Sequence, residues 1–364
     1  MSEDVFLKLR EQLDQYSIGF PATESGVELR VLRKIFTEEE ASMFLDMSLI
    51  LESPETVASR TGRDLESLPD LLEAMARKGQ LFRHRGGESV RYAAVPFVIG
   101  VYEFQLNNMD RELAELTDAY LDEAFMEEAI NKSVQPLRTV PVNRAVDVSY
   151  SVAPYEDARQ IVKGKDKIAV AECLCRVQQG LLQKGCDKPK EVCMSFGSHA
   201  DYYVENGMGR YVTREEALAI LDTCEEAGLV NQPANTINPG GMCNCCGDCC
   251  GLLRAMHRHP KPADLVVTNN SAVVDGDLCV ACETCIDRCQ VAAVSIGAED
   301  VAEVDIDRCI GCGLCVTTCE AEAMTLAQRP EGQRRAPPAS GRDLMMETTS
   351  KRGTSIIPLA VRGK

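Results

Sequence analysis

The sequence predicts a multidomain α+β protein, and three observations indicate this fold class. The first hundred residues combine short helical patterns with a β-hairpin, the middle of the chain contains a buried strand, and the C-terminal part carries a thirty-residue repeat. A chain of 364 residues with 45% hydrophobic side chains is large enough for two or three cores. The predicted divisions are residues 1–133, 134–271 and 272–328, followed by a tail over 329–364.

The N-terminal domain is predicted to hold three helices and then a β-hairpin. The signals are a capping box before the first helix, a proline at the start of the second and a glycine after the third. In chain order these signals are Thr37 with Glu40, Ser53-Pro54 and Gly79, and the hairpin strands follow over 80–85 and 88–94. This order of elements resembles a winged helix-turn-helix module, which implies DNA binding or a protein-docking role.

Charge favours the docking role. The third helix would enter the major groove by its N-terminal end, and phosphates would repel the acidic side chains there. These side chains are Asp64, Glu66, Asp70 and Glu73. Arg83, Arg85 and Arg91 on the hairpin are the favourable charges, but the net charge of the chain is −17. We therefore expect no nucleic acid and no anionic membrane among the partners.

Residues 109–131 are predicted to form an amphipathic helix that belongs to the core or to a dimer seam, so an oligomer is an open expectation. Residues 134–148 contain two prolines and are predicted to be an extended linker. The longest apolar run, 93–102, is too short to span a bilayer, and no signal peptide is recognised. These features predict a cytoplasmic protein without a transmembrane segment.

The middle domain is predicted to be an α/β domain rich in cysteine. A buried strand over 167–171 delivers the first cysteines at its end, and a helix capped by Thr213 follows. Cys224 on that helix is predicted to be a buried core thiol. Nine other cysteines are candidate metal ligands: Cys173, Cys175, Cys186, Cys193, Cys243, Cys245, Cys246, Cys249 and Cys250.

The C-terminal repeat carries a more specific signal. Two runs of C-x2-C-x2-C-x3-C are offset by thirty residues, and this spacing is typical of cubane iron–sulfur ligands. Three cysteines of each run turn onto one cluster, while the fourth lies beyond the loop and serves the other cluster. The predicted ligand sets are Cys279, Cys282, Cys285 and Cys319 for one cluster, and Cys309, Cys312, Cys315 and Cys289 for the other.

Residues 272–328 resemble the bacterial two-cluster ferredoxins. The resemblance implies 4Fe-4S clusters, transfer of single electrons and a reducing, anaerobic setting. The chain departs from the family at Gln290 and Glu320, because the family usually has proline after the fourth cysteine of each run. An N–H group is therefore present at both positions, and a carboxylate lies beside one ligand. Both features bear on the reduction potential.

The middle cysteines allow several ligand divisions. Adjacent side chains point in different directions, so Cys245 with Cys246, and Cys249 with Cys250, are not expected to share one cubane fully. The simplest division gives one cluster to the first four of the nine cysteines and another to four of the last five. The two groups could also interleave. Zinc, a reactive pair or a redox disulfide remain alternatives.

Other polar residues near these cysteines are given structural roles. His199, His257 and His259 are expected to be surface or packing residues rather than ligands. Arg176 follows Cys175 and is expected either to offset cluster charge or to form a surface ion pair.

The predicted function is electron transfer through two, and up to four, 4Fe-4S clusters to or from a partner oxidoreductase. No residue is assigned as catalytic, and no flavin, haem or nucleotide motif is found. Two alternatives stay open: an enzyme with a substrate-binding cluster at the C-x-C-C-x2-C-C site, and a redox-sensing transcription regulator. The tail carries eight basic and three acidic side chains, and we expect it to be extended and to dock on the acidic body or a partner.

Overall fold

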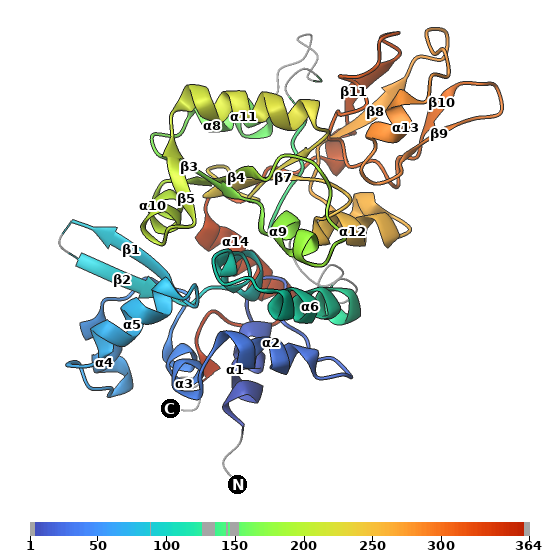
Figure 1. Cartoon of the computed structure of the whole chain (residues 1–364). Helices are drawn as coiled ribbons and strands as arrows, with labels where there is room; N and C mark the ends of the chain where they lie inside the picture. Colours follow the sequence, from blue (N-terminus) through green and yellow to red (C-terminus); the bar gives the residue numbers. More distant parts are fainter. Residues whose placement is uncertain (1–3, 88, 126–134, 143–144, 146–152, 360–364) are drawn as a thin grey trace.

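The computed structural model describes residues 4–87, 89–125, 135–142, 145 and 153–359. Helices and strands are both abundant, which confirms the α+β class. In Figure 1 the N-terminal helices lie below a central sheet, and the C-terminal strands lie beside that sheet at the upper right. The N-terminal, middle and C-terminal parts of the chain are therefore described in turn as three regions.

The N-terminal region has the helices and the hairpin that the sequence predicts, preceded by two further helices. The elements are α1 (Val5–Asp14), α2 (Val27–Ile35), α3 (Glu38–Asp46), α4 (Pro54–Thr61), α5 (Leu68–Arg77), β1 (Phe82–Gly86), β2 (Ser89–Ala93) and α6 (Arg111–Tyr120). Strands β1 and β2 pair antiparallel, with Phe82 opposite Ala93. Position 88 of the predicted hairpin lies outside the described residues.

The predicted helix signals act as expected. Thr37 and Glu40 form the reciprocal capping box of α3, with N–H to side-chain distances of 3.2 and 2.9 Å. Ser53 caps α4, whose first residue is Pro54. Gly79 has a φ of +74°, and a Cβ there would lie 2.4 Å from the carbonyl oxygen of Phe104. Only glycine therefore fits at the end of α5.

Helix α6 covers the first part of the predicted helix over 109–131, and a π-helix over Leu121–Phe125 continues it. Helix α6 begins after Asp110, whose side chain accepts a hydrogen bond from the N–H of Leu113 at 2.8 Å. Positions 126–131 lie outside the described residues. In the predicted linker, 134, 143–144 and 146–148 also lie outside them, while Leu137 and Val140 form bridges to Ala234 and Asn231. This part of the linker runs along the middle domain.

The middle domain is built on a five-stranded sheet in the order β5-β3-β4-β7-β6. Its elements are α8 (Ala158–Lys163), β3 (Ile168–Glu172), α9 (Leu174–Leu181), β4 (Glu191–Phe196), α10 (Ser198–Glu205), β5 (Gly209–Val212), α11 (Arg214–Glu226), β6 (Val230–Pro233), β7 (Gly241–Cys245) and α12 (Gly251–Arg258). The cap of α11 is Thr213, as predicted.

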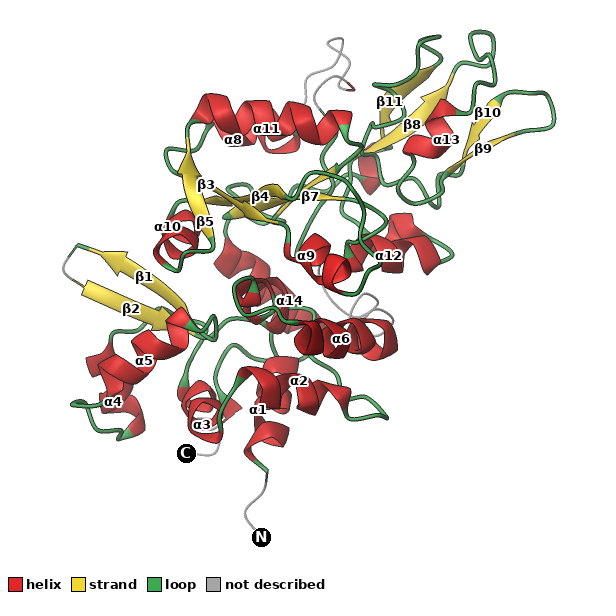
Figure 2. Ribbon diagram, in the orientation of Figure 1, coloured by secondary structure: helices red, strands yellow, loops and turns green. Residues whose placement is uncertain are grey.

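Each ladder of this sheet is antiparallel among the residues that the structure describes. The predicted buried strand is β3, and its apolar run reflects the elements packed around it. Helices cover both faces of the sheet, with α8 and α11 on one side and α9 and α10 on the other (Figure 2). A strand covered on both faces is apolar at successive positions whether its neighbours are parallel or not.

The C-terminal region consists of two small antiparallel ladders around the cysteine runs. Its elements are β8 (Asn270–Val274), α13 (Thr284–Arg288), β9 (Val294–Ile296), β10 (Ala302–Val304) and β11 (Met324–Gln328), with β8 paired to β11 and β9 to β10. The backbone repeats with the sequence: Ala281 and Gly311 both have positive φ, as do Glu283 and Gly313. A Cβ on Gly313 would lie 2.4 Å from that of Ala145, so the tighter second loop needs glycine.

The tail contains a helix, α14 (Gly341–Arg352), so the expectation of an extended tail is wrong for these residues. Ser340 caps the start of α14 and Gly353 ends it with a φ of +67°. Local capping therefore provides order that composition did not indicate. Arg352 donates to the carbonyl oxygen of Asp14 at 2.7 Å, and the N–H of Leu359 donates to Gln12 at 2.7 Å. The tail packs on α1, the body of its own chain.

Candidate metal centres

The first C-terminal site is a small cavity lined by four thiols from both halves of the repeat. The four residues are Cys279, Cys282, Cys285 and Cys319. The first two precede α13, the third lies within it, and the last comes from the second run. The cavity has a volume of about 20 Å³. The fold thus brings together the crossed ligand set that the spacing predicts.

The second C-terminal site has the same construction. Its four thiols are Cys289, Cys309, Cys312 and Cys315, and its cavity also measures about 20 Å³. Cys289 belongs to the first run and ends α13. Each site therefore takes three thiols from one run and one from the other.

Backbone N–H groups point at the sulfur atoms of these sites. The N–H of Ala302 donates to Cys279 Sγ at 3.3 Å, and that of Ala272 donates to Cys309 Sγ at 3.4 Å. The N–H of Ala293 donates to Cys289 Sγ at 3.0 Å. Such donors stabilise anionic sulfur. Thiol number, cavity and donors together fit a tetrathiolate iron–sulfur group at each site.

The two sites differ in exposure. Cys282 of the first site is exposed, and a hydrogen bond with the hydroxyl of Thr284 lowers the pKa of this cysteine. Leu278 and Val280 beside it are 48% and 69% exposed, although both are apolar. In the second site Cys309 and Cys315 are buried. The first site faces solvent and the second faces the protein.

The C-terminal region is fixed to the middle domain beside Cys289. The N–H of Gly247 in the cysteine-rich loop donates to Gln290 Oε1 at 2.8 Å. Arg288 donates to the last carbonyl groups of α11, on Glu225 and Glu226, at 2.6 and 2.9 Å. The sequence drew attention to Gln290 because it replaces a proline. The contact to Gly247 could not be recognised from the sequence, and it requires a side-chain acceptor that proline lacks.

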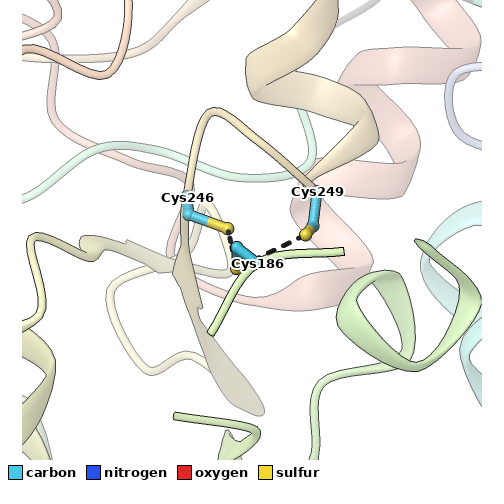
Figure 3. Close-up of side chains that lie close together, drawn as sticks. All are labelled: Cys186, Cys246 and Cys249. Carbon is cyan, nitrogen blue, oxygen red and sulfur yellow. Dashed lines mark hydrogen bonds between the residues drawn. The ribbon is translucent and has the colours of Figure 1, made fainter. Parts of the chain in front are cut away.

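Three middle-domain thiols form a compact group (Figure 3). Cys186 Sγ lies 3.8 Å from Cys246 Sγ and 3.5 Å from Cys249 Sγ, and all three sulfur atoms lie within 4.8 Å of one another. The three come from the loop before β4 and from the loop between β7 and α12. The structure therefore groups a cysteine of the first segment with two of the second. This is the interleaved alternative, and it differs from the simplest division, which kept the two segments apart.

The other six candidate ligands of the middle domain line a second, larger cavity. They are Cys173, Cys175, Cys193, Cys243, Cys245 and Cys250, and the cavity measures about 100 Å³. Side chains of the N-terminal region, among them Tyr102 and Glu103, form the opposite wall. Burial raises the pKa of Glu103 to about 7, although the N–H of Gly100 donates to its carboxylate at 2.7 Å and acts in the opposite sense.

Adjacent cysteines are divided between the two groups. Cys245 and Cys250 line the large cavity, while Cys246 and Cys249 belong to the three-thiol group. The expectation that neighbours in the sequence serve different sites agrees with this geometry. Its physical reason is that successive side chains of an extended segment point to opposite sides.

Arg176 is a buried cation among these thiols. It is 1% exposed, so it does not form the surface ion pair that was one of its predicted roles. One nitrogen donates to the carbonyl oxygen of Asn244 at 3.0 Å, and the described residues offer no hydrogen-bond partner to Nε or the other terminal nitrogen. Burial opposes the charge, but the neighbouring cysteines, first Cys173 and then Cys246, outweigh it and raise the pKa of Arg176.

The remaining candidates have packing roles. Cys224 is fully buried and burial raises its pKa to about 12, as a core thiol requires. His199 stacks on Phe82 with ring centroids 4.7 Å apart, and burial lowers its pKa to about 4, so it is a neutral packing residue. His257 and His259 lie at the end of α12, where their carbonyl oxygens accept hydrogen bonds from Arg308 at 2.8 and 3.0 Å.

Comparison with known families adds one match. A model described as a 4Fe-4S binding domain matches residues 301–324. This match supports the similarity of the C-terminal region to 4Fe-4S binding domains. The matched segment carries three thiols of the second site and one of the first. The comparisons with curated proteins and with solved structures found no match. Among the described residues, no helix has the length and apolar character needed to cross a membrane.

Proposed function

We propose that the protein transfers single electrons through 4Fe-4S clusters between the 4Fe-4S binding domain and the middle domain, and exchanges them with a partner oxidoreductase. The observation that carries this proposal is the pair of crossed four-thiol cavities, each with the ligand number of a cubane. Up to two further centres would be held by the middle thiols. A reducing, cytoplasmic compartment is part of the proposal, because exposed thiolate ligands such as Cys282 require one.

The clusters would supply reversible one-electron chemistry, and the protein would supply position and direction. Leu278 and Val280 give the first site an exposed apolar rim, which suits short-lived contact with a partner protein. The second site is buried and lies next to the middle domain through Gln290. Electrons would therefore enter or leave at the first site and pass inward through the second.

The N-terminal region is proposed to be a scaffold and not a DNA reader. Arg83 and Arg85 on the hairpin donate to Glu73 and to Glu205 of α10, with distances of 2.8 to 2.9 Å. Side chains already engaged with carboxylates are poorly placed to neutralise phosphates. This pairing supports the docking role that the acidic third helix favours.

Ligand assignment gives the first test. Anaerobically purified Cys319→Ala protein should lose the iron of one cubane per chain and keep the electron paramagnetic resonance signal of the other, because only the first site loses a thiol. Cys224→Ala is the matched control, since this buried thiol lines neither C-terminal cavity. Iron and sulfide counts with low-temperature spectra are the measurement. Colourless protein that binds zinc would contradict the proposal.

The route between domains gives the second test. Gln290→Ala removes the acceptor for Gly247, so we expect several-fold slower reduction of the middle-domain metal after rapid reduction of the C-terminal clusters. Glu320→Ala changes the equivalent position of the repeat, beside a ligand of the first site, and should slow this step less than Gln290→Ala does. Stopped-flow absorbance with freeze-quenched spectra measures both. Equal rates in the two variants would show that this contact does not carry the electrons.

A further inference from the structure

The large cavity between the N-terminal region and the middle domain differs in kind from the two C-terminal sites. It is lined by six thiols where each of those has four, and its volume is about 100 Å³ where each of those has about 20 Å³. We propose that this cavity holds one metal–sulfur centre larger than a cubane, bound by all six thiols. The inference uses the proposed function only in taking iron as the metal.

The six thiols form one connected series. All six line the same cavity, and each thiol interacts electrostatically with the next one along the series. In order, the series is Cys193, Cys243, Cys245, Cys250, Cys175 and Cys173. No point along this series separates the six thiols into two independent sites. By contrast, the three-thiol group of Cys186, Cys246 and Cys249 is a separate cluster of sulfur atoms.

Secondary structure aims the thiols into the cavity. Cys243 and Cys245 lie two residues apart in β7, so their side chains share a face of the strand. Cys173 and Cys250 are the N-cap residues of α9 and α12, each a helix of eight residues. The positive ends of two helices therefore meet the cavity, and they favour a bound group of negative charge. Such a site suits an anionic metal–sulfur group.

Smaller occupants leave some of these thiols without a role. A structural zinc ion takes four ligands, and so does a cubane. Either would leave two of the six thiols unused and, judged by the C-terminal cavities, most of the space unfilled. A close-packed interior rarely keeps such a void. A centre with more metal accounts for both the extra thiols and the extra volume.

The N-terminal region closes this site. The first cysteine of the chain is Cys173, so every thiol ligand comes from the middle domain. The opposite wall contains Val98, Ile99, Leu106 and Leu121 from the N-terminal region, with Glu103 as its ionisable group. An apolar wall excludes water from the thiolates. The N-terminal region then serves as one wall of a metal site. Its resemblance to a DNA-binding module does not indicate this role.

Six single Cys→Ala substitutions, one at each thiol of the series, test the proposal in the full-length protein purified without oxygen. Each should remove more iron than the four atoms of one cubane, or alter the same spectroscopic signal, because all six thiols bind one centre. Cys224→Ala is the control for loss of a buried thiol, and Cys186→Ala identifies the iron of the three-thiol group. Mössbauer spectra with iron and sulfide counts are the readout.

Two outcomes would overturn the proposal. If two of the six substitutions left iron content and spectra unchanged, the centre would be a cubane with four ligands. If the cavity bound zinc, the iron count would be the same in all six variants. In both cases the C-terminal signals would persist, so failure of this inference is distinguishable from failure of the proposed electron-transfer function.

Discussion

Arg176→Met should lower the reduction potential of the middle-domain metal by about 40–130 mV. Arg176 is the buried cation between the three-thiol group and the large cavity, and loss of a positive charge disfavours addition of an electron nearby. A unit charge roughly 5 Å away contributes about 1–3 kcal/mol at an effective dielectric constant near 20. For one electron, about 1.4 kcal/mol corresponds to roughly 59 mV. Redox titration followed by electron paramagnetic resonance measures the shift.

The physical basis is the unusual environment of this guanidinium. Arg176 is 1% exposed, and no carboxylate pairs with it in the part of the chain that the structure describes. An isolated buried cation costs several kcal/mol. Anionic metal–thiolate centres on both sides would offset that cost. Iron content should therefore also fall in Arg176→Met, because the centres lose their counter-charge.

Matched variants separate charge from packing. Arg176→Lys keeps the charge and should restore most of the potential. Arg138 is equally buried, but it donates to the carbonyl oxygens of Thr236 and Tyr155 at 2.8 and 2.6 Å and belongs to no thiol group. Arg138→Met should therefore destabilise the fold without moving the potential. An unchanged potential in Arg176→Met would show that Arg176 is only a packing residue.

The C-terminal sites were predictable because their information is local. Each run of cysteines fixes three ligands within one loop, and the repeat specifies which thiol crosses to the other half. The backbone conformation repeats too, since Gly313 and Glu283, at equivalent positions of the two runs, both have positive φ. Short-range spacing was therefore sufficient for these two sites.

The middle domain was not predictable in the same way because its sites form between distant segments. Cys186 meets Cys246 and Cys249 only after β4 and β7 pair in the central sheet. The spacing of the cysteines in the sequence does not predict that these two strands pair. The sequence did indicate that adjacent cysteines separate, because alternation of side chains is a local property. It gave no sign of the wall that the N-terminal region contributes.

The direction of the strands beside β3 was not predictable for a related reason. An apolar run reports that both faces of a strand are covered, and it does not report the direction of the neighbouring strands. The tail was misjudged because its composition is polar, whereas α14 depends on Ser340 and Gly353 at its ends and on contacts with α1. Long-range contacts of this kind are not visible in composition.

Arg83→Ala should destabilise the protein by about 3–5 kcal/mol, the typical cost of removing one partner from a buried ion pair. Arg83 is 2% exposed and donates to Glu73 and Glu205, both at 2.8 Å. It joins the hairpin to α10, so its loss removes the buried cation between Glu73 and Glu205 and leaves the more exposed Arg85 to bridge them. Anaerobic urea unfolding, followed by far-ultraviolet circular dichroism, measures the change.

Arg85→Ala is the matched control, because Arg85 pairs with the same two carboxylates but is 39% exposed in its side chain. A solvent-screened pair contributes about 0.2–1 kcal/mol, so this variant should be close to the wild type. The pH dependence gives a second check. Burial acts to raise the pKa of Glu73, but Arg83 and the hydroxyl of Tyr92 outweigh it and hold that pKa below its ordinary value.

A carboxyl with a depressed folded-state pKa contributes stability that is fully present above its unfolded value of about 4.3 and disappears as the pH falls through the lower folded value. The difference in unfolding free energy between wild type and Arg83→Ala should therefore be constant near neutral pH and shrink in that acidic window. If Arg85→Ala cost as much as Arg83→Ala, burial would not be the source of the effect, and the hairpin contact would be a surface ion-pair network instead.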